Sequence, residues 1–267
     1  MKNRVVVPLG LSILAFVVIL LAESIRIGTG ERPLPIAWSA SGLVLAAVVV
    51  LRWWTVDVGR FETAVQSTNP LPDLPLHPRR YLNMMAAAVA VGLIATVVIA
   101  QNFYLGAGAY LIMHLCLMAA FSGILHLQPR RILNSAALRR PSLITSLFWL
   151  ITTPLVYIFF VYNGPPTLIV APYVAALGLM ALVVWLGLAY KQRPLLFRAL
   201  AAMGAASFVF SDALIGHMVF VNPDTPLVFL ISPTYVLAII LLSQALLFWP
   251  KVMASEETSL ASVSRGE

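Results

Sequence analysis

The chain has 267 residues, of which 61% are hydrophobic and 10% are charged, and its formal net charge is +7. Soluble globular domains are about 45–50% apolar and about 25% charged, so this composition excludes an ordinary soluble domain. The basic residues are scattered over separate short segments, which gives no support for nucleic-acid binding and fits contact with anionic lipid.

Long apolar runs predict an all-α polytopic membrane protein, a bundle of about eight transmembrane helices. A helix that crosses a bilayer needs about 20 predominantly apolar residues, and each of these runs is close to that length. The first run is longer than the apolar part of a signal peptide, which favours a retained helix over a cleaved leader. The predicted spans are residues 5–22, 34–51, 82–100, 104–126, 143–162, 167–190, 199–221 and 227–249.

These spans predict a single transmembrane domain over residues 1–253, with its one long cytoplasmic loop at about 52–81. Residues 254–267 are polar and are predicted to form a disordered cytoplasmic tail. The Asn-Gly-Pro-Pro sequence at 163–166 and the Asn-Pro-Asp sequence at 222–224 predict tight turns between neighbouring spans.

The basic residues predict the orientation of the bundle. With an even number of spans, every Lys and Arg except Arg26 and Arg32 falls on one side of the membrane. The positive-inside rule then places both termini in the cytoplasm. The short loops and compact chain favour an integral protein of a bacterial inner membrane.

Asp212 is the most informative residue, because it lies near the middle of the predicted span 199–221. A carboxylate at that depth costs about 2.5–3.5 kcal/mol on insertion scales, so an intramembrane acid is by default a functional residue. Counted from the extracytoplasmic ends of their spans, His114, Tyr173 and Tyr235 lie at depths that agree with that of Asp212 to within roughly 6 Å. Glu23 lies just above this layer. We therefore predict a polar cluster in the extracytoplasmic half of the bilayer.

Helical phase refines this cluster and leaves ordinary explanations open. Tyr110 and His114 share one helix face, whereas His217 lies about 140° around the helix from Asp212 and does not form a pair with it. Ser211 belongs to a face of small residues that suits close helix packing. A structural histidine, core tyrosines and packing serines remain alternatives for these positions. No two histidines have ligand spacing on one helix, so neither a metal nor a cofactor is predicted.

Four segments, taken in order, resemble motifs of the YhhN-like lysoplasmalogenase family. Residues 204–212 are similar to its G-A-x-x-F-x-x-S-D helix, and the Arg-Pro-Leu-Pro sequence at 32–35 is similar to its K-P-L-P motif. Phe103, Gly106, Tyr110 and His114 follow the family spacing F-x-x-G-x-x-x-F-x-x-x-H, and residues 234–238 resemble its T-Y-Y-x-A-Q run.

The chain departs from the family pattern at two positions. The family usually has Gly-Asp in its third helix, where this chain has Gly92 and Leu93. The glutamine of the last family helix falls on Ile239. If the missing aspartate is essential, the usual reaction is lost or altered, and Glu23 is the nearest candidate for a replacement acid.

The resemblance implies hydrolysis of the vinyl-ether bond of a lysoplasmalogen, which yields a fatty aldehyde and a glycerophospho-base. Under this hypothesis Asp212 is the catalytic acid, alone or as half of an acid–base pair with His114. The residues predicted to bind the membrane lysolipid are Tyr173, Tyr235, Ser211, Glu23 and Arg32. The two tyrosines would orient the substrate or water, and the head group would lie near Arg26 and Arg32. Two alternatives remain: a non-enzymatic lipid-binding or transport protein of the same fold, and a lipid hydrolase with a different substrate.

Overall fold

The computed structural model describes residues 2–29, 57–69, 73, 75–99, 101–125 and 127–249. Seven helices in these ranges are long and apolar enough to cross a membrane. They comprise Leu9–Thr29, Pro78–Ile99, Phe103–Ser122, Ala136–Val161, Pro165–Ala189, Leu195–Val221 and Leu227–Phe248. The described part of the chain contains no strand, which confirms the prediction of an all-α polytopic membrane protein. The predicted span 34–51, Arg32 and the tail 254–267 lie outside the described residues.

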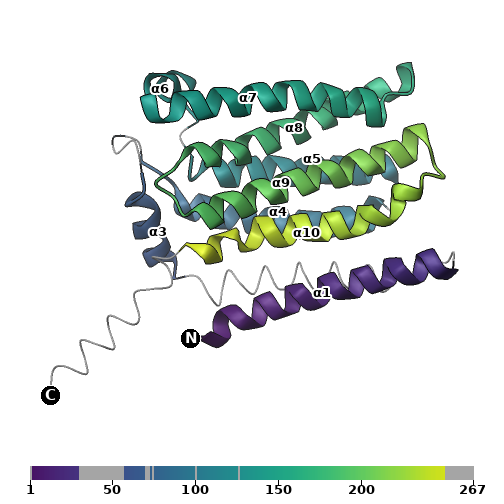
Figure 1. The fold of residues 1–267 in the computed structure, drawn as a ribbon, viewed down its shortest axis with the longest axis horizontal. Coiled ribbons are helices and arrows are strands. Elements are labelled where there is room, and N and C mark those ends of the chain that lie inside the picture. Colours follow the sequence, from purple (N-terminus) through teal and green to yellow (C-terminus); the bar gives the residue numbers. More distant parts are fainter. Residues whose placement is uncertain are drawn as a thin grey trace.

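The spans form a layered bundle around one central helix (Figure 1). Helix α4 (Pro78–Ile99) packs on α5 (Phe103–Ser122), and α5 packs on α8 (Ala171–Leu186). Helix α8 also contacts α7 (Ala136–Val156) and α9 (Leu195–Gly216). Helix α9 packs on α10 (Ile231–Gln244), which contacts α1 (Lys2–Thr29). The α9 span is 61% buried and the α7 span 17%, so α9 is central and α7 peripheral.

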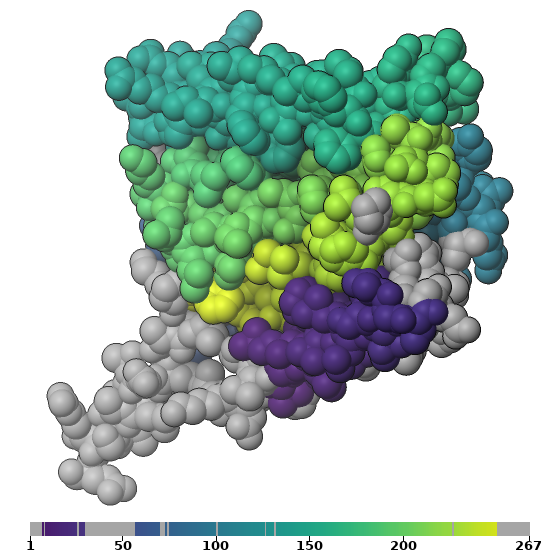
Figure 2. Space-filling model, turned by 45° about the vertical axis from the view of Figure 1, so that its right-hand side comes forward, coloured from purple at the N-terminus to yellow at the C-terminus, as the bar shows by residue number. Residues whose placement is uncertain are grey.

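The outer surface of the bundle is apolar, as lipid contact requires. Figure 2 shows a face on which α9 and α10 lie between α7 on one side and α1 on the other. Large exposed hydrophobic side chains are frequent on both outer helices, among them Leu14 and Leu21 on α1 and Ile144 and Leu150 on α7. In water such a surface would be unfavourable, because burial of apolar area is the main driving force for folding.

The two ends of the bundle differ in character. One end, which we call the basic end, carries α3 (Val58–Gln66), α6 (Pro129–Asn134) and the turn at 190–194 (Figure 1). The other end, which we call the pocket end, carries the turns at 162–164 and 222–225. Two π-helical turns, η1 (Tyr157–Val161) and η4 (His217–Val221), extend α7 and α9 toward the pocket end. The basic loops thus gather at one end, and the cytoplasmic location of that end remains a prediction.

The predicted loop 52–81 contains a helix that the sequence analysis did not anticipate. Asp57 caps α3 by accepting a hydrogen bond from the Arg60 backbone N–H at 3.1 Å. Phe61 and Val65 then lie on one face and join the hydrophobic core. Residues 52–56 lie outside the described range, and α4 already begins at Pro78.

The contact between α9 and α10 depends on the absence of a side chain at Gly204. A Cβ atom at this position would lie 2.9 Å from both the Leu242 backbone nitrogen and Leu242 Cγ. We expect Gly204→Ala to force these helices apart and to destabilise the protein by about 1–3 kcal/mol, the usual cost of overpacking. Thermal unfolding in detergent measures the effect. Gly108→Ala is the matched control, since no heavy atom lies within 4 Å of its added Cβ, and an equal shift in Tm for both variants would contradict the assignment.

Candidate active site

Three of the predicted residues meet inside the bundle at the pocket end. The Tyr173 hydroxyl on α8 donates to Asp212 Oδ2 on α9 at 2.6 Å. His114 Nε2 on α5 lies 3.2 Å from the Tyr173 hydroxyl oxygen and 3.4 Å from Asp212 Oδ2. His114 is fully buried and Asp212 is only 8% exposed. Three different helices therefore supply one buried acid–phenol–imidazole cluster.

The hydrogen bonds within this cluster assign a direction to its protons. Because Tyr173 donates to Asp212, its oxygen is left to accept from His114 Nε2–H. His114 Nδ1 is then the unprotonated nitrogen, and it has no hydrogen-bond partner in the described part of the chain. A neutral imidazole leaves only a lone pair unpaired there, a smaller penalty than a buried N–H donor. These two hydrogen bonds connect His114 through the Tyr173 hydroxyl to the Asp212 carboxyl group.

A second group of polar side chains lies beside the first. Thr96 Oγ1 on α4 is 3.0 Å from the Tyr110 hydroxyl and 3.2 Å from the Tyr235 hydroxyl. The Phe208 ring meets the rings of Tyr110, Tyr235 and His114 edge-on, with centroids 5.0–6.5 Å apart. Phe208 therefore packs between the acid cluster and this hydroxyl cluster, and both belong to one layer of the bundle.

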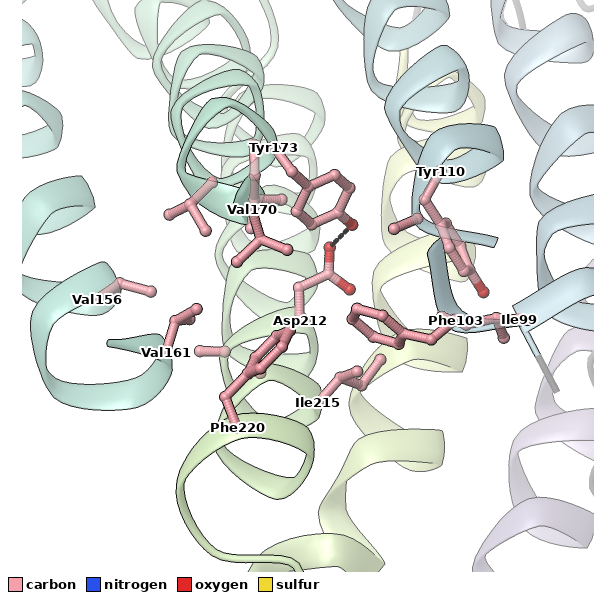
Figure 3. Close-up of a pocket in the computed structure, with 15 residues that line it drawn as sticks. Ile99, Phe103, Tyr110, Val156, Val161, Val170, Tyr173, Asp212, Ile215 and Phe220 are labelled. Atoms are coloured by element: carbon pink, nitrogen blue, oxygen red, sulfur yellow. Dashed lines mark hydrogen bonds between the residues drawn. The ribbon is translucent and has the colours of Figure 1, made fainter. Parts of the chain in front are cut away.

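Asp212, Tyr173 and Tyr110 border a pocket that is otherwise apolar and has a free volume of about 40 Å³. This is less than the about 300–1,000 Å³ of typical ligand pockets, so a bound lipid chain requires the lining side chains to move apart. Figure 3 shows the Asp212 carboxyl group held by Tyr173, with its second oxygen on the side where Phe103 and Tyr110 lie. The other lining residues come from α4, α5, α7, α8, α9, the 3₁₀ helix η2 (Pro165–Val170) and the two π-helical turns: Ile99, Ala107, Val156, Val161, Val170, Val174, Leu177, Ala213, Ile215, Gly216 and Phe220. The pocket thus offers one carboxyl group and two phenols to an apolar ligand.

The outer part of the pocket is shaped by the two π-helical turns. π-Helical turns are rare and occur frequently at functional sites. Val161 in η1 and Phe220 in η4 both line the pocket, and the Phe220 ring meets Phe103 edge-on at 5.5 Å. The Asn163 side-chain amide donates to the Phe220 carbonyl at 2.6 Å and joins the ends of α7 and α9. This bond fixes the position of the aromatic pair.

The remaining predicted site residues are placed differently. Tyr235 belongs to the hydroxyl cluster rather than to the acid cluster. Ser211 does not line the pocket; its buried hydroxyl donates to the Ile231 carbonyl at 3.0 Å and ties α9 to the start of α10. Glu23 is half-buried on α1 and is not a pocket residue. Arg32 lies outside the described residues.

The two departures from the family pattern also have defined positions. Leu93 on α4 is 41% exposed, so it lies on the outer surface of the bundle. Ile239 on α10 is buried in the hydrophobic core. Within the described residues, α4 contributes the Thr96 hydroxyl to the polar layer and no acid.

Sequence reasoning missed Thr96 and Phe208 as parts of this layer, and it placed Tyr110 on the face of His114 without naming it as a site residue. Tyr110 had a usable signal, because it lies one helical turn from His114 on the same face. Thr96 had none, since a threonine in an apolar helix commonly bonds its own backbone, as Thr96 also does to the Gly92 carbonyl. The described residues include no group of three or more His, Cys, Asp or Glu side chains that could hold a metal ion.

Fold and site together define a polytopic helical membrane protein with a buried acid at the edge of an apolar pocket. The model of the YhhN family matches residues 73–246, which include α4 to α10 and every residue of both polar clusters. The chain belongs to the YhhN family. No curated protein and no solved structure matches the chain significantly.

Proposed function

We propose that this protein hydrolyses the vinyl-ether bond of lysoplasmalogen-type lysolipids. The observation that carries the proposal is the buried Asp212–Tyr173–His114 cluster at the wall of an apolar pocket. Membership of the YhhN family supports a membrane role of this kind. The apolar walls suit the hydrocarbon chain of the lysolipid, and the carboxyl group supplies the acid that cleavage of an enol ether requires.

The reaction begins with a proton transfer from the Asp212 carboxyl group to the β-carbon of the vinyl ether. The O–H bond breaks, a C–H bond forms from the π electrons, and the α-carbon becomes part of an oxocarbenium ion. A water molecule adds to that carbon, and its proton returns to the Asp212 carboxylate. The resulting hemiacetal collapses to a fatty aldehyde, and its hydroxyl proton passes to the departing glycerol oxygen. The net change is the addition of one water molecule.

The neighbouring groups have distinct roles in this scheme. Tyr173 orients the Asp212 carboxyl group through its 2.6 Å hydrogen bond. The His114 Nε2–H group, whose nitrogen lies 3.4 Å from Asp212 Oδ2, points its positive end at the carboxylate that forms after the first step and so stabilises its charge. Tyr110 is the member of the hydroxyl cluster that reaches the pocket, and it is positioned to hold the attacking water with Thr96 behind it.

The decisive experiment is an assay of the purified protein with three lysolipids that share one head group. They carry a vinyl-ether chain, a saturated alkyl-ether chain and an acyl chain. We expect a fatty aldehyde from the vinyl ether and no product from the alkyl ether, because protonation needs the double bond. In heavy water the aldehyde should carry one deuterium on the carbon next to the carbonyl group.

The other outcomes of this assay contradict the proposal in different ways. Fatty acid released from the acyl lysolipid, without aldehyde from the vinyl ether, would indicate a lipid hydrolase with a different substrate. Binding of the vinyl-ether lysolipid without any product would indicate a lipid-binding or transport protein. Leu93 stands where the family pattern has an aspartate, and this missing acid is the observation that favours the last alternative.

A further inference from the structure

A buried guanidinium group without a partner lies at the basic end, far from the pocket. Arg193 is in the turn between the Pro165–Ala189 and Leu195–Val221 spans and is 1% exposed. None of its three side-chain nitrogens has a hydrogen-bond partner in the part of the chain that the structure describes. No carboxylate of the described residues forms an ion pair with it. By contrast, Arg198 in the same region donates to the Arg193 and Leu188 carbonyls at 3.1 and 2.7 Å.

Aromatic rings surround this group but do not compensate for its burial. The Arg193 Cζ atom lies 4.4 Å from the Tyr190 ring centroid and 6.0 Å from that of Trp249. Burial lowers the pKa of Arg193 to about 10, so the group still carries its charge at neutral pH. Cation–π contact offsets only part of the desolvation of a guanidinium, which is large for an unpaired buried charge. The group therefore lacks an acceptor for its N–H donors.

Two neighbouring features lack an acceptor as well. The Trp249 indole N–H is buried and has no hydrogen-bond partner within residues 2–249 where these are described, and indole nitrogen is a donor only. Helix α9 begins at Leu195, directly after Pro194, and its first turn has no side-chain cap. The N-terminus of a helix presents free N–H groups and a partial positive charge. Phe197 in this turn packs on Trp249, with ring centroids 4.7 Å apart, so all three features lie together.

We propose that Arg193, the Trp249 indole N–H and the first turn of α9 form a binding site for a phosphate group. The chemistry is that of an anion with several acceptor oxygens, because the site offers only donors and positive charge. A phosphate is favoured over a protein carboxylate by depth. Arg193 lies two residues before one span and four after another, where the phosphates of a bilayer lie. Lys191, in the same turn, is exposed and is not part of this site.

The site is closed without its anion, since Arg193 is almost fully buried. Occupation requires the turn at 190–194 to shift, and the guanidinium exchanges part of its contact with Tyr190 for charge-assisted hydrogen bonds. The phosphate could belong to an anionic phospholipid such as phosphatidylglycerol or to free phosphate. The inference is independent of the chemistry at the pocket, which lies at the opposite end of the bundle.

The test measures thermal unfolding of the full-length protein in neutral detergent micelles with one of three additions. These are phosphatidylglycerol, phosphatidylcholine and inorganic phosphate. We expect phosphatidylglycerol to raise the Tm of the wild type and of Lys191→Gln, and to leave that of Arg193→Gln unchanged. Titration followed by native mass spectrometry should show phosphatidylglycerol bound about tenfold more weakly, or worse, by Arg193→Gln. If inorganic phosphate also raises the Tm, the ligand is any phosphate group. If only phosphatidylglycerol raises the Tm, the ligand is the lipid.

Arg193→Lys keeps the test informative if Arg193→Gln does not fold. It retains the charge but loses the planar fork of donors, so we expect clearly weaker binding of phosphatidylglycerol than in the wild type. The proposal is overturned if the wild type, Arg193→Gln and Arg193→Lys bind phosphatidylglycerol and phosphate equally. It is also overturned if Lys191→Gln loses binding as completely as the Arg193 variants, because the effect would then be one of surface charge alone.

Discussion

Replacement of Asp212 by Asn should abolish aldehyde release from a vinyl-ether lysolipid while the protein continues to fold. The amide has nearly the shape of the carboxyl group, and its oxygen can still accept the 2.6 Å hydrogen bond from Tyr173. It cannot donate a proton to carbon. Loss of general acid catalysis costs about 10²–10⁴-fold in rate, so we expect turnover to fall by at least about 10²-fold. The measurement is kcat for purified variants at matched concentration.

The control for this variant is Asp224→Asn, the same change at an exposed residue in the turn at the pocket end. It makes the same change of side chain near the same membrane surface without touching the pocket, and its kcat should equal that of the wild type. The Tm of Asp212→Asn should stay close to the wild-type value, because no buried hydrogen bond is broken. Turnover by Asp212→Asn at the wild-type rate would remove Asp212 from the mechanism.

The fold and the centre of the site follow from simple properties of the sequence. Apolar runs of bilayer length identified each of the spans in the described residues, because hydrophobic thickness fixes helix length. Counting residues from the span ends then placed Asp212, His114 and Tyr173 at one depth, and the structure joins them by contacts of 2.6–3.4 Å. The constant rise of an α-helix makes depth predictable from sequence.

The direction in which each side chain points around its helix axis was harder to predict than its depth in the bilayer. Ser211 shares the depth of Asp212 but points toward α10, where its hydroxyl meets the Ile231 carbonyl. Thr96 reaches Tyr235 across the bundle, a contact between residues far apart in the chain. Such pairings depend on which helices become neighbours and on how they turn, and these are set by packing of the whole bundle.

The burial of Arg193 at the basic end was also not predictable from the sequence. The sequence places Arg193 in a short basic loop, where charged side chains are normally solvated. Its burial results from Tyr190 and Trp249, and Trp249 follows the last span. The short helix α3 also packs there, with Phe61 against Trp249. Only the tertiary structure reveals that this loop is covered.

Replacement of His114 by Gln should reduce kcat by about 10²-fold and leave substrate binding nearly unchanged. His114 does not line the pocket, so its removal should affect the proton chain rather than the contact with the lipid. Gln fills most of the volume of the imidazole and can donate to Tyr173, but it cannot accept a proton. Once Asp212 has given its proton to the substrate, the carboxylate then lacks the imidazole that lies 3.4 Å away in the wild type.

The matched control for His114→Gln is His217→Gln in η4, at the same end of the bundle. His217 packs on Phe160 and makes no contact with Asp212 in the described structure, so its replacement should leave kcat within about twofold of the wild type. A purely structural role for His114 predicts a lower Tm for His114→Gln with kcat per folded molecule unchanged. A role in stabilising the Asp212 carboxylate predicts the reverse, a reduced kcat at an almost constant Tm and KM. The second pattern is expected here, because the Tyr173–Asp212 hydrogen bond survives the substitution while the only imidazole beside it in the described structure is removed.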